Sequence, residues 1–143
     1  MYMDNELIFD NDVAHLTTEA SAAYIDFKGP RNLGIGEDLF VVAIVTTAFT
    51  DSSSNSTMAL TLETDDNSSF STATTTLAIG TFAALAAIGD RLIKKLSPGD
   101  INERYCRVKY TVANGDLSTG KFKTFITKDP DNYVAYPDGF AIQ

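Results

Sequence analysis

The chain has 143 residues, a single cysteine, a single histidine and a formal net charge of −8, with a sequence pI of about 4.4. One domain of this length can bury a hydrophobic core. The acidic charge argues against nucleic acids and membranes as partners, because phosphate-rich surfaces are bound through Lys and Arg. A single cysteine excludes an intrachain disulfide.

The amino-terminal residues, MYMDNELIF, are acidic, whereas a secretory signal peptide needs a basic start and a longer apolar run. The most apolar stretch, residues 77–88, is too short to span a bilayer. We therefore expect a protein that is made in the cytoplasm of a cell and used there or in a particle assembled there.

Short strands bounded by turn residues are predicted before residue 100: residues 6–9, 22–27, 38–47, 57–64, 74–79 and 90–96. Residues 38–47 (DLFVVAIVTT) are β-branched and almost continuously apolar, which predicts a central strand. Polar turns or loops are expected between the strands: residues 10–18, which contain His15, and residues 28–37, 51–56 and 65–71. Residues 81–88 favour a helix by propensity but are short and lie between glycines, so we expect an irregular or extended connector.

Residues 103–129 predict a two-stranded hairpin. Its first arm alternates between an apolar and a polar face: Cys106, Val108, Tyr110 and Val112 against Tyr105, Arg107, Lys109 and Thr111. This period of two indicates a strand with one buried face, on which Cys106 is a small buried hydrophobe. The turn contains Asn114-Gly115, a pair that readily adopts positive φ. The second arm, residues 121–128, alternates as well.

About eight short strands with turn signals roughly every ten residues are typical of an all-β protein, either a β-sandwich or a barrel. Neither an internal repeat nor a domain linker is visible. We expect a β-sandwich domain over residues 1–129 and a carboxy-terminal arm over residues 130–143, which is rich in turn residues and aromatic residues.

No catalytic, cofactor or metal site is predicted, and we expect a protein that is not an enzyme. One histidine and one cysteine cannot form a zinc tetrad. Residues 65–76 lack the spacing of a calcium-binding EF-hand loop. Residues 34–36 (GIG) precede a strand, whereas phosphate-binding loops follow a strand and open a helix.

Seven basic residues in the later strands admit two interpretations: Lys94, Lys95, Arg107, Lys109, Lys121, Lys123 and Lys128. They lie on exposed strand faces, where lysine discourages unwanted strand pairing, or they form a basic patch that docks on an acidic partner. The tail aromatics Tyr133, Tyr136 and Phe140 also admit two interpretations. They fold back over the sandwich, or they form a contact surface, since Tyr and Phe are enriched in interface cores.

Four segments in order resemble one known family: ELIF at residues 6–9, GIGEDLFVVAIV at 34–45, LTLETDDNSSF at 60–70, and YCRVKYTVANGDLSTGKFKTFI at 105–126. The chain resembles the capsid cement (decoration) proteins of tailed bacteriophages, of the type first described in a Bordetella phage. The resemblance covers roughly residues 5–129 and does not extend to the tail.

The resemblance implies a jelly-roll-like antiparallel β-sandwich with a structural role. Such a protein binds the outer surface of the phage capsid at capsomer junctions and stabilises the shell against internal DNA pressure. Its partners would be the major capsid protein and further copies of itself, as a dimer or trimer. It would be made in the bacterial host cytoplasm and reside on the virion.

Candidate contact residues are those that the core does not need: Tyr2, Met3, Lys28, Arg31, Tyr133, Tyr136 and Phe140. The alternative function is a carbohydrate-binding β-sandwich module. Such modules often use tryptophan as a sugar platform, and this chain has none.

Overall fold

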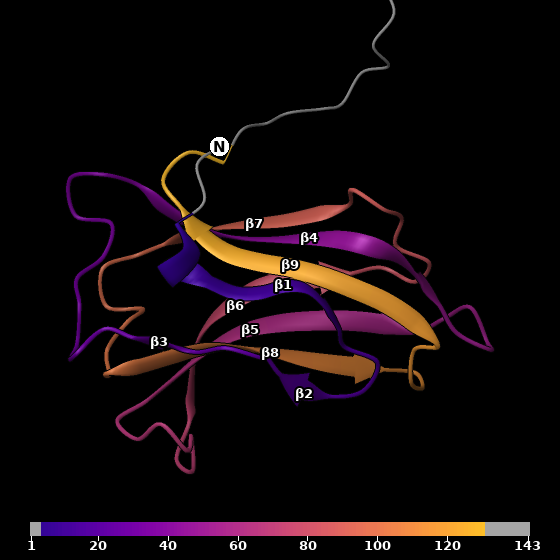
Figure 1. Ribbon diagram of the computed structural model, residues 1–143, viewed down its shortest axis with the longest axis horizontal. Helices are drawn as coiled ribbons and strands as arrows, with labels where there is room; N and C mark the ends of the chain where they lie inside the picture. The colour runs from indigo at the N-terminus through magenta and orange to yellow at the C-terminus, as the bar shows by residue number, and fades with distance from the viewer. Residues whose placement is uncertain (1–3, 131–143) are drawn as a thin grey trace, which may run out of the picture.

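The computed structural model describes residues 4–130, which form two antiparallel sheets packed face to face (Figure 1). Sheet A contains, in spatial order, β1 (Ile8–Ala14), β9 (Thr119–Thr127), β4 (Leu39–Thr50) and β7 (Arg91–Leu96). Sheet B contains β2 (Glu19–Ala20), β8 (Tyr105–Ala113), β5 (Thr57–Asp65) and β6 (Thr74–Phe82), and β3 (Ile25–Asp26) also pairs with β8. A short 3₁₀ helix, η1 (Asn5–Leu7), precedes β1.

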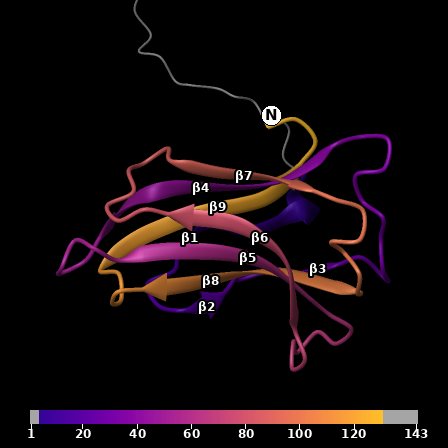
Figure 2. The same cartoon turned by 180° about the vertical axis from the view of Figure 1, so that it is seen from behind.

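The order of the strands is that of a jelly roll. Strands β2 and β3 both pair with β8, so together they act as one interrupted strand. The two sheets then read 1-9-4-7 and 2/3-8-5-6, an eight-stranded double-sheet arrangement. Seen from behind, β6 and β5 lie beside each other while β7 continues into the opposite sheet (Figure 2). The predicted jelly-roll-like β-sandwich is confirmed.

The predicted hairpin over residues 103–129 is wrong. Strand β8 lies in sheet B between β5 and the β2/β3 edge, whereas β9 lies in sheet A between β1 and β4. Asn114 and Gly115 do adopt positive φ, 69° and 105°. The error arises because period-two alternation and an Asn-Gly turn are shared by hairpins and by arches that cross between sheets. Among the described strands, only β5 and β6 are both consecutive and paired.

The amino-terminal predictions also need correction. Glu6 and Leu7 belong to η1, and the first strand runs over Ile8–Ala14, so its predicted bounds and the predicted turn from residue 10 are wrong. The polar character of residues 10–18 predicts a turn, yet Asp10 is 1% exposed. Its Oδ2 accepts a hydrogen bond of 2.7 Å from the Tyr110 hydroxyl, so a partner distant in sequence keeps this carboxylate inside a strand.

The second predicted strand, residues 22–27, is reduced to Ile25–Asp26, and β2 (Glu19–Ala20) was missed. Both are two-residue pieces defined by pairing with β8, which local sequence does not reveal. The central position of residues 38–47 is confirmed, since β4 pairs with β9 and β7. In the connector 81–88, the first two residues extend β6 and the others are irregular, as expected.

Aromatic rings fill the centre of the core. Phe122 lies 5.2 Å from both Phe49 and Tyr110, measured between ring centroids, and Phe82 completes the group. Cys106 is fully buried, as predicted, and burial raises the pKa of its thiol. The inward faces of both sheets therefore form one continuous core.

Candidate interface at the terminal end of the sandwich

Two of the predicted contact residues, Lys28 and Arg31, belong to a loop at one end of the sandwich. Strand β1 begins there, β9 ends there, and the 28–37 loop leads into the start of β4 at the same end (Figure 1). Five predicted contact residues lie outside the described residues: Tyr2, Met3, Tyr133, Tyr136 and Phe140. The first described residue, Asp4, and Asp129 near the last one both lie at this end, where they line the same groove.

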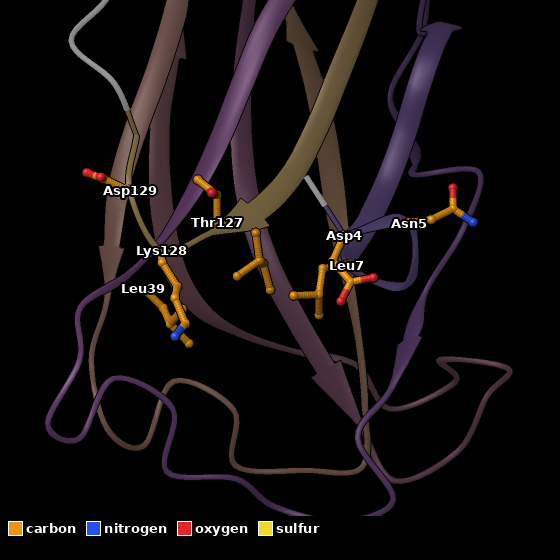
Figure 3. A pocket seen from close by; sticks show the side chains of 8 residues that line it. Asp4, Asn5, Leu7, Leu39, Thr127, Lys128 and Asp129 are labelled. Carbon is orange, nitrogen blue, oxygen red and sulfur yellow. The ribbon is translucent and has the colours of Figure 1, made fainter. Parts of the chain in front are cut away.

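A groove of about 700 Å³ opens between these segments (Figure 3). Its apolar side chains come from three elements: Leu7 in η1, Leu39 at the start of β4, and Ile126 in β9. Its remaining lining residues are polar or charged: Asp4, Asn5, Thr127, Lys128 and Asp129. The groove thus lies at the edge of the core, beside both ends of the described residues.

Local hydrogen bonds form the amino-terminal wall of this groove. The Asp4 carboxylate caps η1 by accepting from the Glu6 amide at 3.0 Å, and the Leu7 amide donates to the Asp4 carbonyl at 3.0 Å. This turn directs Leu7 towards the core, against which it packs. On the other side, Lys128 forms an ion pair with Glu37, which links the end of β9 to the 28–37 loop.

Lys28 and Arg31, the two predicted contact residues that the structure describes, are both engaged within the chain. Lys28 Nζ lies 2.7 Å from Asp26 Oδ2, and Arg104 donates two hydrogen bonds of 2.9 Å to the same carboxylate. Hydrogen bonds from Arg104, followed by those from Lys28, hold the pKa of Asp26 well below its usual range. Arg31 Nε donates to the Phe27 carbonyl at 3.0 Å. Their contact with a partner stays a prediction.

Ile35 is the contact candidate that sequence reasoning missed. Its side chain is 67% exposed at the tip of the 28–37 loop. Gly34 and Gly36 flank it with φ of +86° and +81°, and a Cβ on Gly34 would lie only 2.9 Å from the Leu96 carbonyl oxygen. The loop is therefore seated on the end of β7. An apolar residue between two glycines in a polar loop was the available signal.

Exposed apolar side chains also occur at the opposite end. Leu85 and Ile88, in the β6–β7 connection, are 54% and 70% exposed. Their loop is held in place, because the Phe49 amide donates to the Ala86 carbonyl at 3.0 Å and Asp90 Oδ2 accepts from the Ala87 amide at 2.9 Å. Both ends of the sandwich thus present apolar groups on structured loops.

Within residues 4–130, the structure brings together no group of three or more His, Cys, Asp or Glu residues that could hold a metal ion. The same residues contain no helix with the length and apolarity needed to cross a membrane.

Comparison with known proteins identifies a family for the chain. The family model named Bbp16 matches residues 11–126. This range begins within β1, ends within β9 and includes all the described strands between them. None of the curated proteins matches the chain. Because the match extends over most of the chain, this protein belongs to the Bbp16 family, a family of Bordetella phage proteins.

Proposed function

We propose that the protein is a structural component of a phage virion that binds the outer surface of the capsid at capsomer junctions and stabilises the shell. Membership of the Bbp16 family is the observation that carries the proposal. Its partners are the major capsid protein and further copies of this chain, as a dimer or trimer. Such a protein helps the shell to resist the pressure of the packaged DNA.

The architecture supports this role physically. A sandwich whose sheets share one core loses little conformational entropy when it binds. Ile35 at one end and Leu85 with Ile88 at the other are exposed apolar groups on structured loops. Two separated contacts on one rigid domain allow it to bridge neighbouring subunits, and the second contact then forms at high effective concentration.

Purified protein added to phage heads that lack it provides the test. We expect saturable binding with a fixed number of copies per head, and heads that release their DNA at a higher temperature when decorated. Heads that bind none of the protein would contradict the proposal. Binding to a glycan array in that case would establish the carbohydrate-binding alternative, although Tyr24 and Tyr105 meet edge to face, at 84°, and form no flat sugar platform.

A further inference from the structure

Charged residues are absent from one long segment of the chain. The sequence contains 11 Lys and Arg residues and 19 Asp and Glu residues, yet none of them lies between Asp66 and Asp90. Residues 67–89, the uncharged segment, comprise the β5–β6 turn, strand β6 and the β6–β7 connection. On a chain whose net charge is −8, this segment offers a surface that is built without carboxylates.

Strand β6 is also a sheet edge without charged side chains. Sheet A ends at β1 and β7, and sheet B ends at β2/β3 and at β6 (Figure 2). Strands β1 and β7 carry charged residues, while β2 and β3 are two residues long and acidic, and both features discourage pairing with another chain. Strand β6 has nine residues and no charge, and within residues 4–130 it pairs only with β5. Its second edge can therefore accept a further strand.

Two irregularities in the pairing of β6 with β5 limit what this edge can do alone. The register shifts between Leu60 and Thr61 and again between Leu62 and Glu63. Bulges of this kind bend a strand and interrupt its ladder of hydrogen bonds, so a further strand can form only a short ladder with β6. A stable contact at this edge also needs support from the flanking loops.

The β6–β7 connection provides that support. Its side chains Leu85 and Ile88 are 54% and 70% exposed. The backbone of this connection is anchored to β4, where the Gly89 amide donates to the Val45 carbonyl at 2.9 Å in addition to the hydrogen bonds described above. The two apolar side chains are thus carried on a loop that is ordered before binding, which lowers the entropic cost of a contact.

The uncharged segment is arranged symmetrically around β6. The segment runs from residue 67 to residue 89 and β6 from residue 74 to residue 82, so both have Ala78 at their midpoint. When two identical strands pair antiparallel about a two-fold axis at Ala78, residues 83–89 of one copy lie at the same end as residues 67–73 of the other. Both flanking segments are uncharged, so neither brings a charged residue into the contact.

A second copy of this chain is therefore the occupant that this edge fits. Two chains of net charge −8 repel each other, and an uncharged contact keeps that repulsion smallest. We propose that two copies associate through their β6 edges, antiparallel about Ala78, and join their B sheets into one continuous sheet. Leu85 and Ile88 of each copy then pack against residues 67–73 of the other. This inference rests on the self-association that is part of the proposed function.

The expected size of this contact is modest. The nine residues of β6 at about 3.3 Å each give a strand about 30 Å long, and one sheet layer is about 10 Å deep, which gives on the order of 300 Å² on each copy. A standard interface buries about 800 Å² on each partner. The loop contacts add to the strand pairing, and we expect a dimer that dissociates on dilution.

Light scattering during size-exclusion chromatography of the full-length chain, over a range of concentrations, provides the test. We expect the wild type to approach twice the chain mass of 15.5 kDa as the concentration rises. Ala78 is exposed, and A78K and A78E each place like charges opposite each other at the two-fold axis. The dissociation constant of the dimer should therefore rise at least about tenfold in each variant. An equimolar mixture of A78K and A78E should restore the dimer.

A matched control separates the position of the new charge from its presence. Thr111 is also exposed on sheet B, but its strand β8 lies inside the sheet, between β5 and β2/β3. We expect T111K to dimerise like the wild type. Circular dichroism establishes that each variant is folded, and T81K, at a second exposed position of β6, repeats the test if A78K does not fold.

Four results would overturn this inference: a wild type that stays monomeric or forms a trimer, dimers of A78K and A78E as stable as the wild type, a mixture of the two that stays monomeric, and an equal loss in T111K. Head binding is measured separately on the same proteins. A wild type that dimerises through β6 but does not bind heads would support this inference and overturn the capsid role. A monomer that decorates heads would do the reverse.

Discussion

Asp10 shows how one buried carboxylate joins the two sheets. Its Oδ2 accepts from the Tyr110 hydroxyl at 2.7 Å, and its Oδ1 accepts from the Ala22 amide at 2.8 Å. The Tyr110 hydroxyl also lies 2.6 Å from Thr124 Oγ1, and the ring of His15 stacks on Tyr110 at 3.9 Å. The network links β1 and β9 of sheet A to β8 of sheet B, in an interior where each unmade hydrogen bond is expensive.

Replacement of Tyr110 by Phe removes a donor to the buried Asp10 carboxylate and the partner of the buried Thr124 hydroxyl. We expect the free energy of unfolding to fall by about 1–3 kcal/mol, because Asp10 remains buried with one partner fewer. Urea unfolding of Y110F and the wild type measures the difference. Tyr24, which is 50% exposed, provides the matched control Y24F, for which we expect no measurable change. Equal stability of Y110F and the wild type would show that the hydroxyl contributes nothing net.

Asp65 determines how the β5–β6 hairpin responds to acid. Backbone hydrogen bonds from Asn67 at 2.9 Å and Thr72 at 2.8 Å hold the pKa of its carboxyl below the usual value. A carboxyl whose pKa is lowered by folding stabilises the protein above its unfolded pKa of about 3.9, and this stabilisation is lost as the pH falls through the folded pKa. The melting temperature of the wild type should therefore fall more steeply below about pH 4 than that of D65N.

At pH 7 D65N should melt at a lower temperature than the wild type, because the ionised Asp65 carboxylate is a better hydrogen-bond acceptor than the asparagine amide. Asp116, exposed in the β8–β9 connection, supplies the control D116N, whose melting curve should follow the wild type at both pH values. If the melting temperatures of D65N and the wild type fell equally as the pH was lowered, Asp65 would not be the source of the acid sensitivity.

The reactivity of the Cys106 thiol provides a measure of unfolding. Its side chain is fully buried, and burial raises the pKa of the thiol, so the reactive thiolate is absent from the folded protein at neutral pH. We expect the thiol reagent DTNB to leave the native chain unmodified and to titrate its single thiol once urea is added. Reaction of the native protein within the mixing time would mean that this part of β8 opens readily.

At the scale of elements, the seat of the 28–37 loop depends on Gly34. Its φ is +86°, and a Cβ there would lie 2.9 Å from the Leu96 carbonyl oxygen, whereas a Cβ on Gly36, at φ +81°, would meet nothing within 4 Å. Both alanine variants bear the left-handed strain of about 1–2 kcal/mol. We expect G34A to cost about 1–3 kcal/mol more than G36A, because backbone atoms cannot yield cheaply.

Thermal or urea unfolding of the two alanine variants, measured side by side, gives this difference directly. Equal costs would show that the loop lifts off β7 without penalty. Because the loop carries Ile35, G34A should also weaken head binding more than G36A does.

Elements whose pattern is intrinsic to their own residues were predictable, and those defined by distant partners were not. Strand β4 could be predicted because its residues are almost continuously apolar. The crossing of the chain between β8 and β9 could not be predicted, because the turn chemistry of residues 114–115 is compatible with a hairpin as well as with an arch. Asp10 looks like a turn residue until Tyr110, 100 positions later, is placed beside it.

The candidate site follows the same rule. The proximity of the first and last described strands could not be predicted, since it depends on the pairing of β1 with β9. The groove draws Leu7, Leu39 and Ile126 from three separate segments, and none of them is unusual in its own context. Ile35, by contrast, could have been identified from its local sequence, because it is an apolar residue between two glycines in a polar loop.

At the scale of the whole molecule, the pairing of β1 with β9 joins the two ends of the domain and leaves residues 131–143 beyond the last strand. A chain that ends at Pro130 retains all nine strands of the described residues. We expect its free energy of unfolding to stay within about 0.5 kcal/mol of the full-length value, because every described strand pair is preserved. Urea unfolding and light scattering on both chains test this.

The same truncation should weaken self-association or head binding, since Tyr133, Tyr136 and Phe140 are lost and aromatic residues are the usual anchors of interface cores. The triple variant Y133S/Y136S/F140S retains the length of the segment and separates the loss of aromatic anchors from the loss of chain. If the truncated protein assembles and decorates heads normally, the segment is not a contact element. Contact must then come from the described domain, where Ile35 and the 85–88 loop provide exposed apolar groups.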